Sequence, residues 1–255
     1  MPRFETFDGI ELTYDDEGEG TSVLLLHGFA ADADINWRRP GVIDALVADG
    51  RRVISYDARG HGRSDKPHDP KAYGGNAMVK DATALLDHLD VGDVDVAGYS
   101  MGALVALRLV GAESRVQSAV LGGIGGQAGP KESDRARIAD ALEADDASKA
   151  GGQAKAFRSF ADTTGADLRA LAAIQRAQLM MAPVDLTAVK VPVLVLVGDR
   201  DDLAKKPEKL AAKIPGATVE IVSGSHLSAV NDPKFARAIV RFVSDQVAKR
   251  ASARG

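Results

Sequence analysis

Short apolar runs alternate along the chain with longer segments in which apolar residues recur every three or four positions. The short runs are rich in Val, Leu and Ile on both faces, which is typical of strands buried in a parallel sheet. The longer segments have the length and spacing of crossover helices. This alternation predicts an α/β fold, with a mostly parallel central sheet and helices on both of its faces. The predicted strands are residues 21–28, 51–57, 94–100, 116–123, 191–199 and 217–224, and the predicted crossover helices are residues 40–50, 75–90, 101–112 and 208–214.

The sequence near each end of the chain predicts a further structural element. Residues 3–18 contain two strand-like segments on either side of an Asp-Gly pair, which favours a tight turn, so we expect an antiparallel hairpin at one edge of the sheet. Near the other end, Asp232 can cap a helix whose first turn holds Pro233. The basic tail, residues 249–255, is expected to be frayed and solvated.

One long segment interrupts the alternation. Residues 130–183 show no strand signal and contain helical sequence rich in Ala, Asp and Lys. We expect this segment to form a small helical cap, or lid, inserted into the α/β body. The predicted organisation is therefore a core made of residues 1–129 and 184–255 and a cap made of residues 130–183.

The composition excludes several classes of protein. Of the 255 residues 45% are hydrophobic, which is enough for a sizeable core, and the net charge of −4 is spread along the chain, so we expect neither nucleic acid nor a membrane as a partner. Without cysteine the chain has no disulfide and no thiolate metal ligand. The apolar runs fall short of the ~18 residues of a membrane span and the acidic N-terminus lacks the apolar region of a signal peptide, so we expect a soluble, cytoplasmic protein.

The strongest chemical signal is a serine at the junction of a strand and a helix. The segment Gly98-Tyr99-Ser100-Met101-Gly102 matches the pattern G-x-S-x-G, with strand-like sequence before it and helix-like sequence after it. A sharp turn would expose the Ser100 hydroxyl at the carboxyl edge of the sheet, and the two glycines would avoid collisions of Cβ atoms there. Ser100 is therefore the predicted nucleophile.

A serine nucleophile needs a base, and the base needs an acid to orient it. In hydrolases with this turn the chain order is serine, acid, histidine. His226 is the one histidine after Ser100, and it lies between the last predicted strand and the last predicted helix. The acid is expected at the end of the preceding strand, where we choose Asp201, with Asp202 as the alternative and Asp199 as a solvated neighbour.

Acyl transfer also needs N–H donors for the developing oxyanion. The amide of Met101, directly after the serine, is expected to supply one donor, and the loop after the first buried strand a second, for which we choose Phe29. Trp37 is expected either to pack beneath this loop or to line the substrate pocket. The cap has few aromatic residues, and Phe157 and Phe160 are its candidates for that pocket.

Several motifs together resemble the α/β-hydrolase superfamily, in its order and over nearly the whole chain. They are HGF, YDARGHGRSD, GYSMG, GDRDD and SGSHL. The resemblance implies structural roles for Asp57 and Arg59 and places the cap after the sixth strand, where the superfamily commonly carries its lid. His27 precedes the serine and is expected to brace the oxyanion loop by hydrogen bonds. HGF and GYSMG further resemble the branch of serine esterases and cofactor-free haloperoxidases, or perhydrolases.

The departures from related families narrow the predicted chemistry. Epoxide hydrolases and haloalkane dehalogenases are similar to this chain but carry an aspartate nucleophile, and the cap contains no tyrosine that could activate an epoxide. We therefore expect a carboxylesterase-like serine hydrolase that cleaves small-molecule carboxylic esters or lactones, of small to medium acyl groups, through an acyl-enzyme, without a cofactor or metal. Two alternatives stay open: a perhydrolase or carbon–carbon bond hydrolase that uses the same residues, and a non-catalytic ligand receptor on a hydrolase scaffold.

Overall fold

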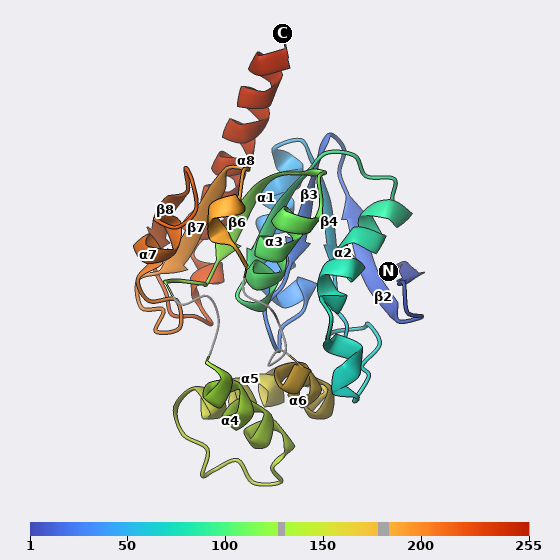
Figure 1. The fold of residues 1–255 in the computed structure, drawn as a ribbon, viewed down its shortest axis with the longest axis vertical. Coiled ribbons are helices and arrows are strands. Elements are labelled where there is room, and N and C mark those ends of the chain that lie inside the picture. Colours follow the sequence, from blue (N-terminus) through green and yellow to red (C-terminus); the bar gives the residue numbers. More distant parts are fainter. Residues whose placement is uncertain (127–130, 178–183, 255) are drawn as a thin grey trace.

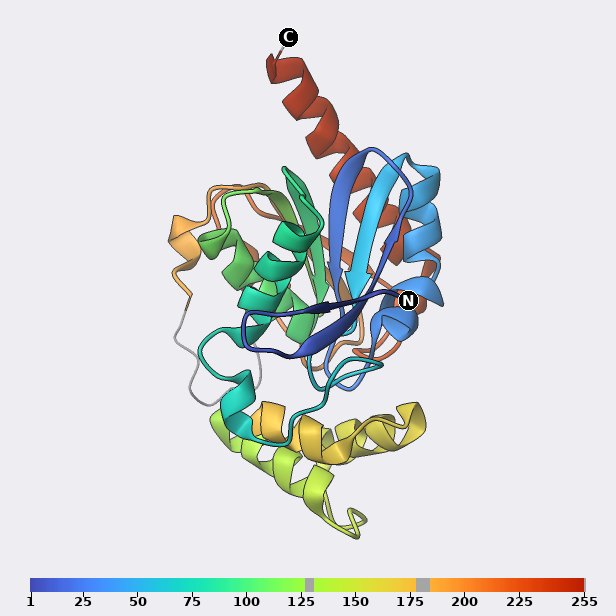
Figure 2. The same cartoon turned by 90° about the vertical axis from the view of Figure 1, so that its right-hand side faces the viewer.

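The computed structural model describes residues 1–126, 131–177 and 184–254 and shows one sheet between two layers of helices (Figures 1 and 2). The sheet has eight strands in the order β1-β2-β4-β3-β5-β6-β7-β8. All neighbours from β4 to β8 are parallel, and β2 joins β4 in the antiparallel sense. The predicted α/β fold is therefore confirmed, and so is the hairpin, since β1 pairs with β2 antiparallel across a turn in which Gly9 has a φ of 82°.

The element bounds follow the predicted segments closely. The strands are β1 (Arg3–Glu5), β2 (Glu11–Glu17), β3 (Thr21–Leu26), β4 (Arg51–Tyr56), β5 (Val94–Tyr99), β6 (Val116–Gly122), β7 (Val193–Gly198) and β8 (Thr218–Val222). The helices are α1 (Val42–Ala48), α2 (Ala77–His88), α3 (Met101–Ala112), α4 (Glu132–Glu143), α5 (Gly152–Thr164), α6 (Leu168–Ala177), α7 (Pro207–Ala211) and α8 (Pro233–Arg254). Short helical turns are η1 (Asp34–Arg38), η2 (Pro70–Tyr73), η4 (Leu186–Ala188) and η5 (Ala229–Asn231).

Both faces of the central strands are buried, which explains their continuous apolar sequence. In β3, Leu24 and Leu26 pack in the cluster that contains residues of α2 and α3. Val23 and Leu25 of the same strand pack in the opposite cluster, with residues of α1 and α8. Because successive side chains of a strand point to opposite faces, a strand between two helical layers is apolar at most of its positions.

The last helix is longer than the sequence indicated. α8 (Pro233–Arg254) begins after Asp232, as predicted, but it runs to the end of the described chain and projects beyond the body (Figure 1). Arg250 donates from both terminal nitrogens to the buried carboxylate of Asp95, at 2.9 and 2.7 Å. The expectation that residues 249–255 are frayed is therefore wrong as far as residue 254, which is helical, and the ion pair ties the helix to β5 at Arg250. The expectation that this tail is solvated is confirmed for residues 249 and 251–253, which are exposed.

A buried arginine fixes the loop after β4. The guanidinium of Arg59 donates to both carboxylate oxygens of Asp81, at 2.7 and 2.5 Å, and to both of Asp8, at 2.8 and 2.9 Å. The hydrogen bond from Arg59 lowers the pKa of Asp8 below its ordinary value. Asp57 accepts the N–H of Ala33 at 3.0 Å. These contacts bind the N-terminal hairpin, α2 and two loops together, so Asp57 and Arg59 have the structural roles that the resemblance implied.

Three helices form a separate layer at the carboxyl edge of the sheet. α4 packs on both α5 and α6 there, and α6 also packs on η2 (Figures 1 and 2). Thr164, at the end of α5, donates from its hydroxyl to the carbonyl of Ala30 at 3.0 Å, in the loop after β3. These helices lie within the predicted cap. Its predicted limits, residues 130 and 183, fall outside the described residues.

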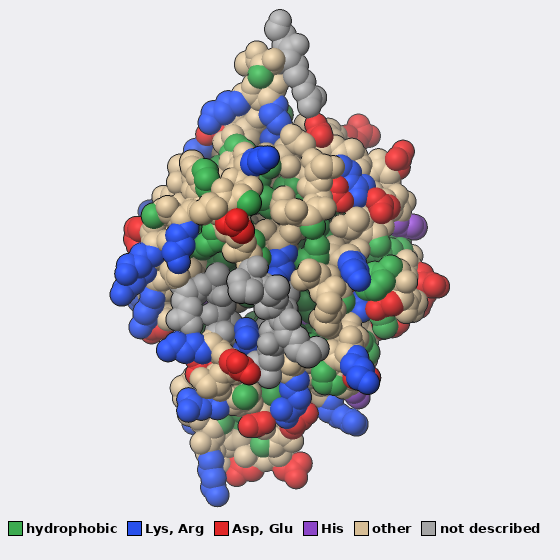
Figure 3. All heavy atoms as spheres, in the orientation of Figure 1, with side chains coloured by type: hydrophobic (Ala, Val, Ile, Leu, Met, Phe, Trp, Pro, Cys, Tyr) green, Lys and Arg blue, Asp and Glu red, His purple; other side chains and the backbone are tan. Residues whose placement is uncertain are grey.

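The surface carries both signs of charge. Acidic side chains are interspersed over the face shown in Figure 3, and basic side chains gather on the side of α7, where Lys205, Lys206, Lys209 and Lys213 are exposed. No helix within the described ranges is long and apolar enough to cross a membrane.

Candidate active site

Ser100 occupies the sharp turn between β5 and α3 that the sequence predicted. Its backbone has φ 52° and ψ −108°, a conformation that costs free energy for a residue with a Cβ atom. Two backbone hydrogen bonds hold it: its N–H donates to the carbonyl of Gly122 at 2.8 Å, and its carbonyl accepts the N–H of Leu104 at 3.1 Å. The neighbouring strand and the first turn of α3 therefore maintain the strained turn.

The two glycines of the motif are required by close backbone contacts. A Cβ atom on Gly98 would lie 2.3 Å from the carbonyl oxygen of Gly102. A Cβ atom on Gly102 would lie 1.9 Å from the carbonyl oxygen of Leu26, at the end of β3. The absence of a side chain at Gly98 lets α3 begin close to β5, and its absence at Gly102 lets α3 pack against the end of β3.

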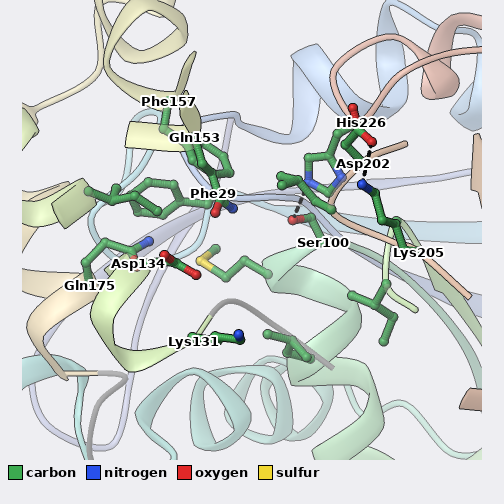
Figure 4. Close-up of a pocket in the computed structure, with 16 residues that line it drawn as sticks. Phe29, Ser100, Lys131, Asp134, Gln153, Phe157, Gln175, Asp202, Lys205 and His226 are labelled. Atoms are coloured by element: carbon green, nitrogen blue, oxygen red, sulfur yellow. Dashed lines mark hydrogen bonds and ion pairs between the residues drawn. The ribbon is translucent and has the colours of Figure 1, made fainter. Parts of the chain in front are cut away.

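Three predicted residues from three separate loops form one chain of hydrogen bonds. The Nε2 atom of His226 lies 2.9 Å from the Oγ of Ser100, and the dashed line in Figure 4 marks this contact. On the other side of the ring, Nδ1 lies 3.0 and 2.9 Å from the two carboxylate oxygens of Asp201. A carboxylate accepts, so Nδ1 carries the proton and Nε2 is free to accept from the serine hydroxyl. The arrangement can pass a proton from Ser100 to His226.

The structure separates Asp201 from the other two candidate acids. The Asp201 side chain is fully buried and also accepts the N–H groups of Leu203 and Ala204, at 2.9 and 3.0 Å. The Asp202 side chain is 86% exposed and pairs with Lys205. Asp199 accepts the N–H of Gly224 and so braces the loop that carries the histidine. Of the three, Asp201 is therefore the one in contact with the imidazole.

Tyr99 is a supporting residue that the sequence reasoning missed. Its hydroxyl donates to the backbone carbonyl of His226 at 2.6 Å, and its ring lies 5.6 Å from the imidazole. Burial raises the pKa of Tyr99 well above its ordinary value, so the hydroxyl stays protonated and remains a donor. Its position beside the nucleophile, inside the G-x-S-x-G segment, was the signal that could have identified it.

The loop after β3 is fixed directly beside the nucleophile. The N–H of Gly28 donates to the side-chain oxygen of Asn36 at 2.6 Å. His27 donates from Nδ1 to the carbonyl of Gly28 at 2.8 Å, and its Nε2 accepts the N–H of Ala58 at 2.9 Å, so it braces the loop as expected. Phe29 follows in this loop and lines the cavity at the serine. Asn36 is a second residue that the sequence reasoning missed.

Met101 is the other residue chosen for the oxyanion. It is the first residue of α3, and the first N–H groups of a helix have no carbonyl four residues earlier to bind. Such groups carry part of the positive end of the helix dipole and are suited to a developing negative charge. Phe29 and Met101 both line the cavity that reaches Ser100; in the sequence, one precedes the nucleophile and the other directly follows it.

Two cavities meet at the nucleophile. The first, drawn in Figure 4, has a volume of about 250 Å³, and the second about 230 Å³. Ser100 and His226 line both of them. Phe29 and Phe157 also line both, and their rings meet edge to face at 5.5 Å, so they form a common wall. Phe160 lines the second cavity. The cap therefore brings Phe157 and Phe160 to the site.

The expectation that Trp37 lines the pocket is wrong. Trp37 is fully buried and packs with Val23 and Ile43, on the side of the sheet covered by α1 and α8. Trp37 belongs to η1, a wide helical turn. This turn directs Asn36 toward the loop after β3 and Trp37 into the core. Phe29 and Ala30 of the loop after β3 belong to the cluster on the other side of the sheet, so packing beneath that loop stays a prediction.

Comparisons with known proteins agree with the fold. A family model described as the alpha/beta hydrolase fold matches residues 21–187. Among curated proteins, the chain is 37% identical over 123 residues to a non-heme chloroperoxidase of Kitasatospora aureofaciens, a match that covers 48% of this chain and 43% of that protein. The chain thus spans less than half the length of this relative.

Solved structures match over nearly the whole chain. A hydrolase from Pseudomonas aeruginosa PA01 superimposes with a TM-score of 0.79 at 27% identity and covers 95% of this chain and 97% of its own. A thermophilic esterase from Thermogutta terrifontis superimposes with a TM-score of 0.77 at 25% identity, over 96% of this chain and 99% of its own.

Proposed function

Because the chain belongs to the α/β-hydrolase family, we propose that it is a serine hydrolase that cleaves carboxylic esters or lactones of small to medium acyl groups. The observation that carries the proposal is the chain of hydrogen bonds from Ser100 through His226 to the buried Asp201. It joins a nucleophile, a base and an acid in the order that acyl transfer requires.

The reaction proceeds in two halves. Ser100 attacks the carbonyl carbon while its proton passes to Nε2 of His226, and the negative charge that develops on the carbonyl oxygen is stabilised by the N–H groups of Phe29 and Met101. His226 then returns the proton to the departing alcohol, which leaves an acyl group on the Ser100 oxygen. Water attacks this acyl group with His226 again as base, and the carboxylic acid is released. Asp201 holds the imidazole in the required tautomer throughout.

A second candidate shares the first half of this reaction. In a perhydrolase, hydrogen peroxide takes the place of water and attacks the acyl-enzyme, which releases a peroxycarboxylic acid and frees the serine. The similarity to a non-heme chloroperoxidase favours this candidate over a carbon–carbon bond hydrolase. Measuring carboxylic acid and peracid formation from one ester, with and without peroxide, separates the two activities.

A screen of p-nitrophenyl esters with acyl chains from C2 to C12, together with lactones and amides, tests the proposal. We expect hydrolysis of the esters, with a maximum of kcat/KM between acetate and butyrate, because the two cavities hold only about 250 and 230 Å³. A longer apolar channel would add about 0.8 kcal/mol, or several-fold, for each methylene. A maximum at C8 or beyond contradicts the small acyl group. Saturable binding of esters without any turnover supports a receptor and contradicts the hydrolase.

A further inference from the structure

The loop after β3 carries Phe29, the proposed oxyanion donor, outside any helix or strand. This loop lies between β3 and η1, so no ladder of backbone hydrogen bonds orients its N–H groups. The preceding residue, Gly28, is instead held at both of its peptide groups. Its N–H donates to Oδ1 of Asn36 at 2.6 Å. Its carbonyl accepts from Nδ1 of His27 at 2.8 Å and from the N–H of Ala31 at 3.3 Å.

The contacts at Gly28 act on Phe29 because a peptide group is planar. The carbonyl of Gly28 and the N–H of Phe29 belong to one trans peptide group and point in opposite directions. Any rotation of the backbone at Gly28 therefore changes the direction of the Phe29 N–H. Glycine rotates more freely than any other residue, so this direction must be fixed by other groups. His27 fixes the carbonyl of Gly28, and Asn36 fixes its N–H.

Asn36 is placed for this contact by the wide turn η1. The N–H of Arg39 donates to the carbonyl of Asp34, five residues earlier, at 2.9 Å, which is the hydrogen bond of a π-type turn. Such turns are rare and are frequently found at functional sites. Only 5% of Asn36 is exposed, and Gly28 is buried as well. A leucine in place of Asn36 would therefore leave a buried N–H without an acceptor.

The side chain of Asn36 also lies close to the nucleophile. A Cβ atom built on Gly28 would lie 3.3 Å from Oδ1 of Asn36 and 3.5 Å from the Cβ atom of Ser100. Asn36, Gly28 and Ser100 line the same cavity, the second of the two. A small movement of the loop at Gly28 would therefore change the space directly beside the reacting group.

We propose that Asn36 is a positioning residue, which acts through Gly28 to keep the N–H of Phe29 directed at the oxygen that gains negative charge. The inference rests on the proposed ester hydrolysis, in which this N–H stabilises the oxyanion of both half-reactions. The contact matters most when the oxyanion forms, so its loss lowers kcat and leaves the binding of the ester unchanged.

Two substitutions that remove the acceptor test the proposal. Asn36→Leu is close to asparagine in size, and Asn36→Ala removes the acceptor without adding bulk. With p-nitrophenyl acetate, Asn36→Leu should lower kcat by about 10²-fold, as for the loss of one oxyanion donor, and leave KM within about threefold. Asn36→Ala should show the same division between kcat and KM. Gln246→Leu is the matched control, since Gln246 is also buried but lies on α8 and lines neither cavity, and it should keep the wild-type kcat.

A trifluoromethyl ketone provides a second readout, which a loss of stability alone would not change. The Ser100 oxygen bonds to the carbonyl carbon of the ketone, the serine proton passes to His226, and the carbonyl oxygen becomes an oxyanion without turnover. In Asn36→Leu its inhibition constant should rise by about the factor by which kcat falls. The matching methyl ketone, which binds without this addition, should inhibit both proteins equally.

Each outcome decides one of two questions. Hydrolysis of no ester by the wild-type protein overturns the proposed function and this inference with it. If the wild-type protein is active, a kcat within about threefold of its value in both variants overturns the inference alone. A loss that appears only in KM, or an unchanged inhibition by the trifluoromethyl ketone, also overturns it. If Asn36→Leu does not fold, the same measurements on Asn36→Ala decide the question.

Discussion

The cavity at Ser100 has one wall formed by the α/β body and one formed by the helical cap, and these two walls are held in place by different means. On the side of the body, backbone contacts fix the geometry. Gly102 packs directly on the backbone of β3, and the N–H of Ser100 donates a hydrogen bond to the carbonyl of Gly122 in β6. On the side of the cap, side chains on α4, α5 and α6 define the space, and the cap is attached to the body by contacts such as that of Thr164 with Ala30.

This difference corresponds to two different requirements. Nucleophile, base and acid must lie within hydrogen-bond distance of one another, and a displacement of 1 Å costs much of the rate, so they are placed on interlocked backbone. Substrate selection needs only a cavity of a given shape and polarity, and helices that pack through side chains can change it without moving the nucleophile. We therefore expect substitutions in the body wall to affect turnover or folding and substitutions in the cap wall to affect the choice of substrate.

The largest effect is expected when the orientation of the base is lost. Asp201→Asn should lower kcat for ester hydrolysis by about 10³- to 10⁴-fold, because an asparagine amide favours the wrong tautomer of His226. Asp202→Asn is the matched control and should stay within about twofold of the wild type, since its side chain faces solvent. Both values come from steady-state kinetics on one p-nitrophenyl ester. A greater loss in Asp202→Asn would refute the assignment of the acid.

Two glycines of α3 test how far the body wall depends on close backbone contact. Gly102→Ala should lower the free energy of unfolding by about 3 kcal/mol or more, because its methyl group would lie 1.9 Å from the carbonyl oxygen of Leu26. Gly111→Ala has no atom within 4 Å of the new methyl group and should raise stability by about 0.5–1 kcal/mol. Urea unfolding measures both. Equal stability of the two variants would show that the turn is not tightly packed.

A smaller effect is expected from a buried histidine beneath the loop of Phe29. His61 packs edge to face against His27 and Phe29, with ring centroids 5.0 and 6.0 Å apart. Burial, together with the nearby His27, lowers the pKa of His61 to about 3. The unfolded chain binds a proton here near pH 6.5 and the folded chain only near pH 3, so stability is complete above pH 6.5 and falls as the pH drops between these values.

Substitution of His61 should remove the one proton that this side chain takes up when the protein unfolds in acid. His61→Phe should flatten the decrease of the unfolding free energy between pH 6 and pH 4 by at most about 1.4 kcal/mol per pH unit. Urea unfolding of both proteins over this range measures the slope, and unfolding at pH 8 provides the reference. An identical slope in the two proteins would mean that His61 is protonated in the folded chain.

Much of this architecture could be predicted from the sequence because it depends on local pattern and chain order. The apolar runs identified the strands from β3 to β8, because strands buried on both faces are mostly apolar. The expectation of burial on both faces is wrong for β8, which lies at the edge of the sheet and exposes Thr218 and Ile221. Ser100, Asp201 and His226 could be found because each follows a strand at the carboxyl edge of the sheet, where the loops meet. The predicted strand ends indicated that these three residues lie near one another, and the structure shows the hydrogen bonds among them.

What could not be predicted depends on packing between distant segments. Trp37 and Asn36 are adjacent in sequence, yet one enters the core and the other supports Gly28, because η1 turns them in different directions. Arg250 is part of a basic tail in the sequence, and only the position of Asp95 on β5 shows why that tail is helical.

The most direct test of the account is to locate the nucleophile with an organophosphorus probe that reacts covalently with activated serines. Mass spectrometry of the digested wild-type protein should find one adduct, on Ser100, and ester hydrolysis should stop as the adduct forms. Ser100→Ala should fold normally, take up no probe and lose hydrolysis except for the residual ~10³-fold acceleration over the uncatalysed reaction that oxyanion binding alone can give. An adduct on another serine, or hydrolysis by Ser100→Ala above that residual level, would contradict the assignment of Ser100 as the nucleophile.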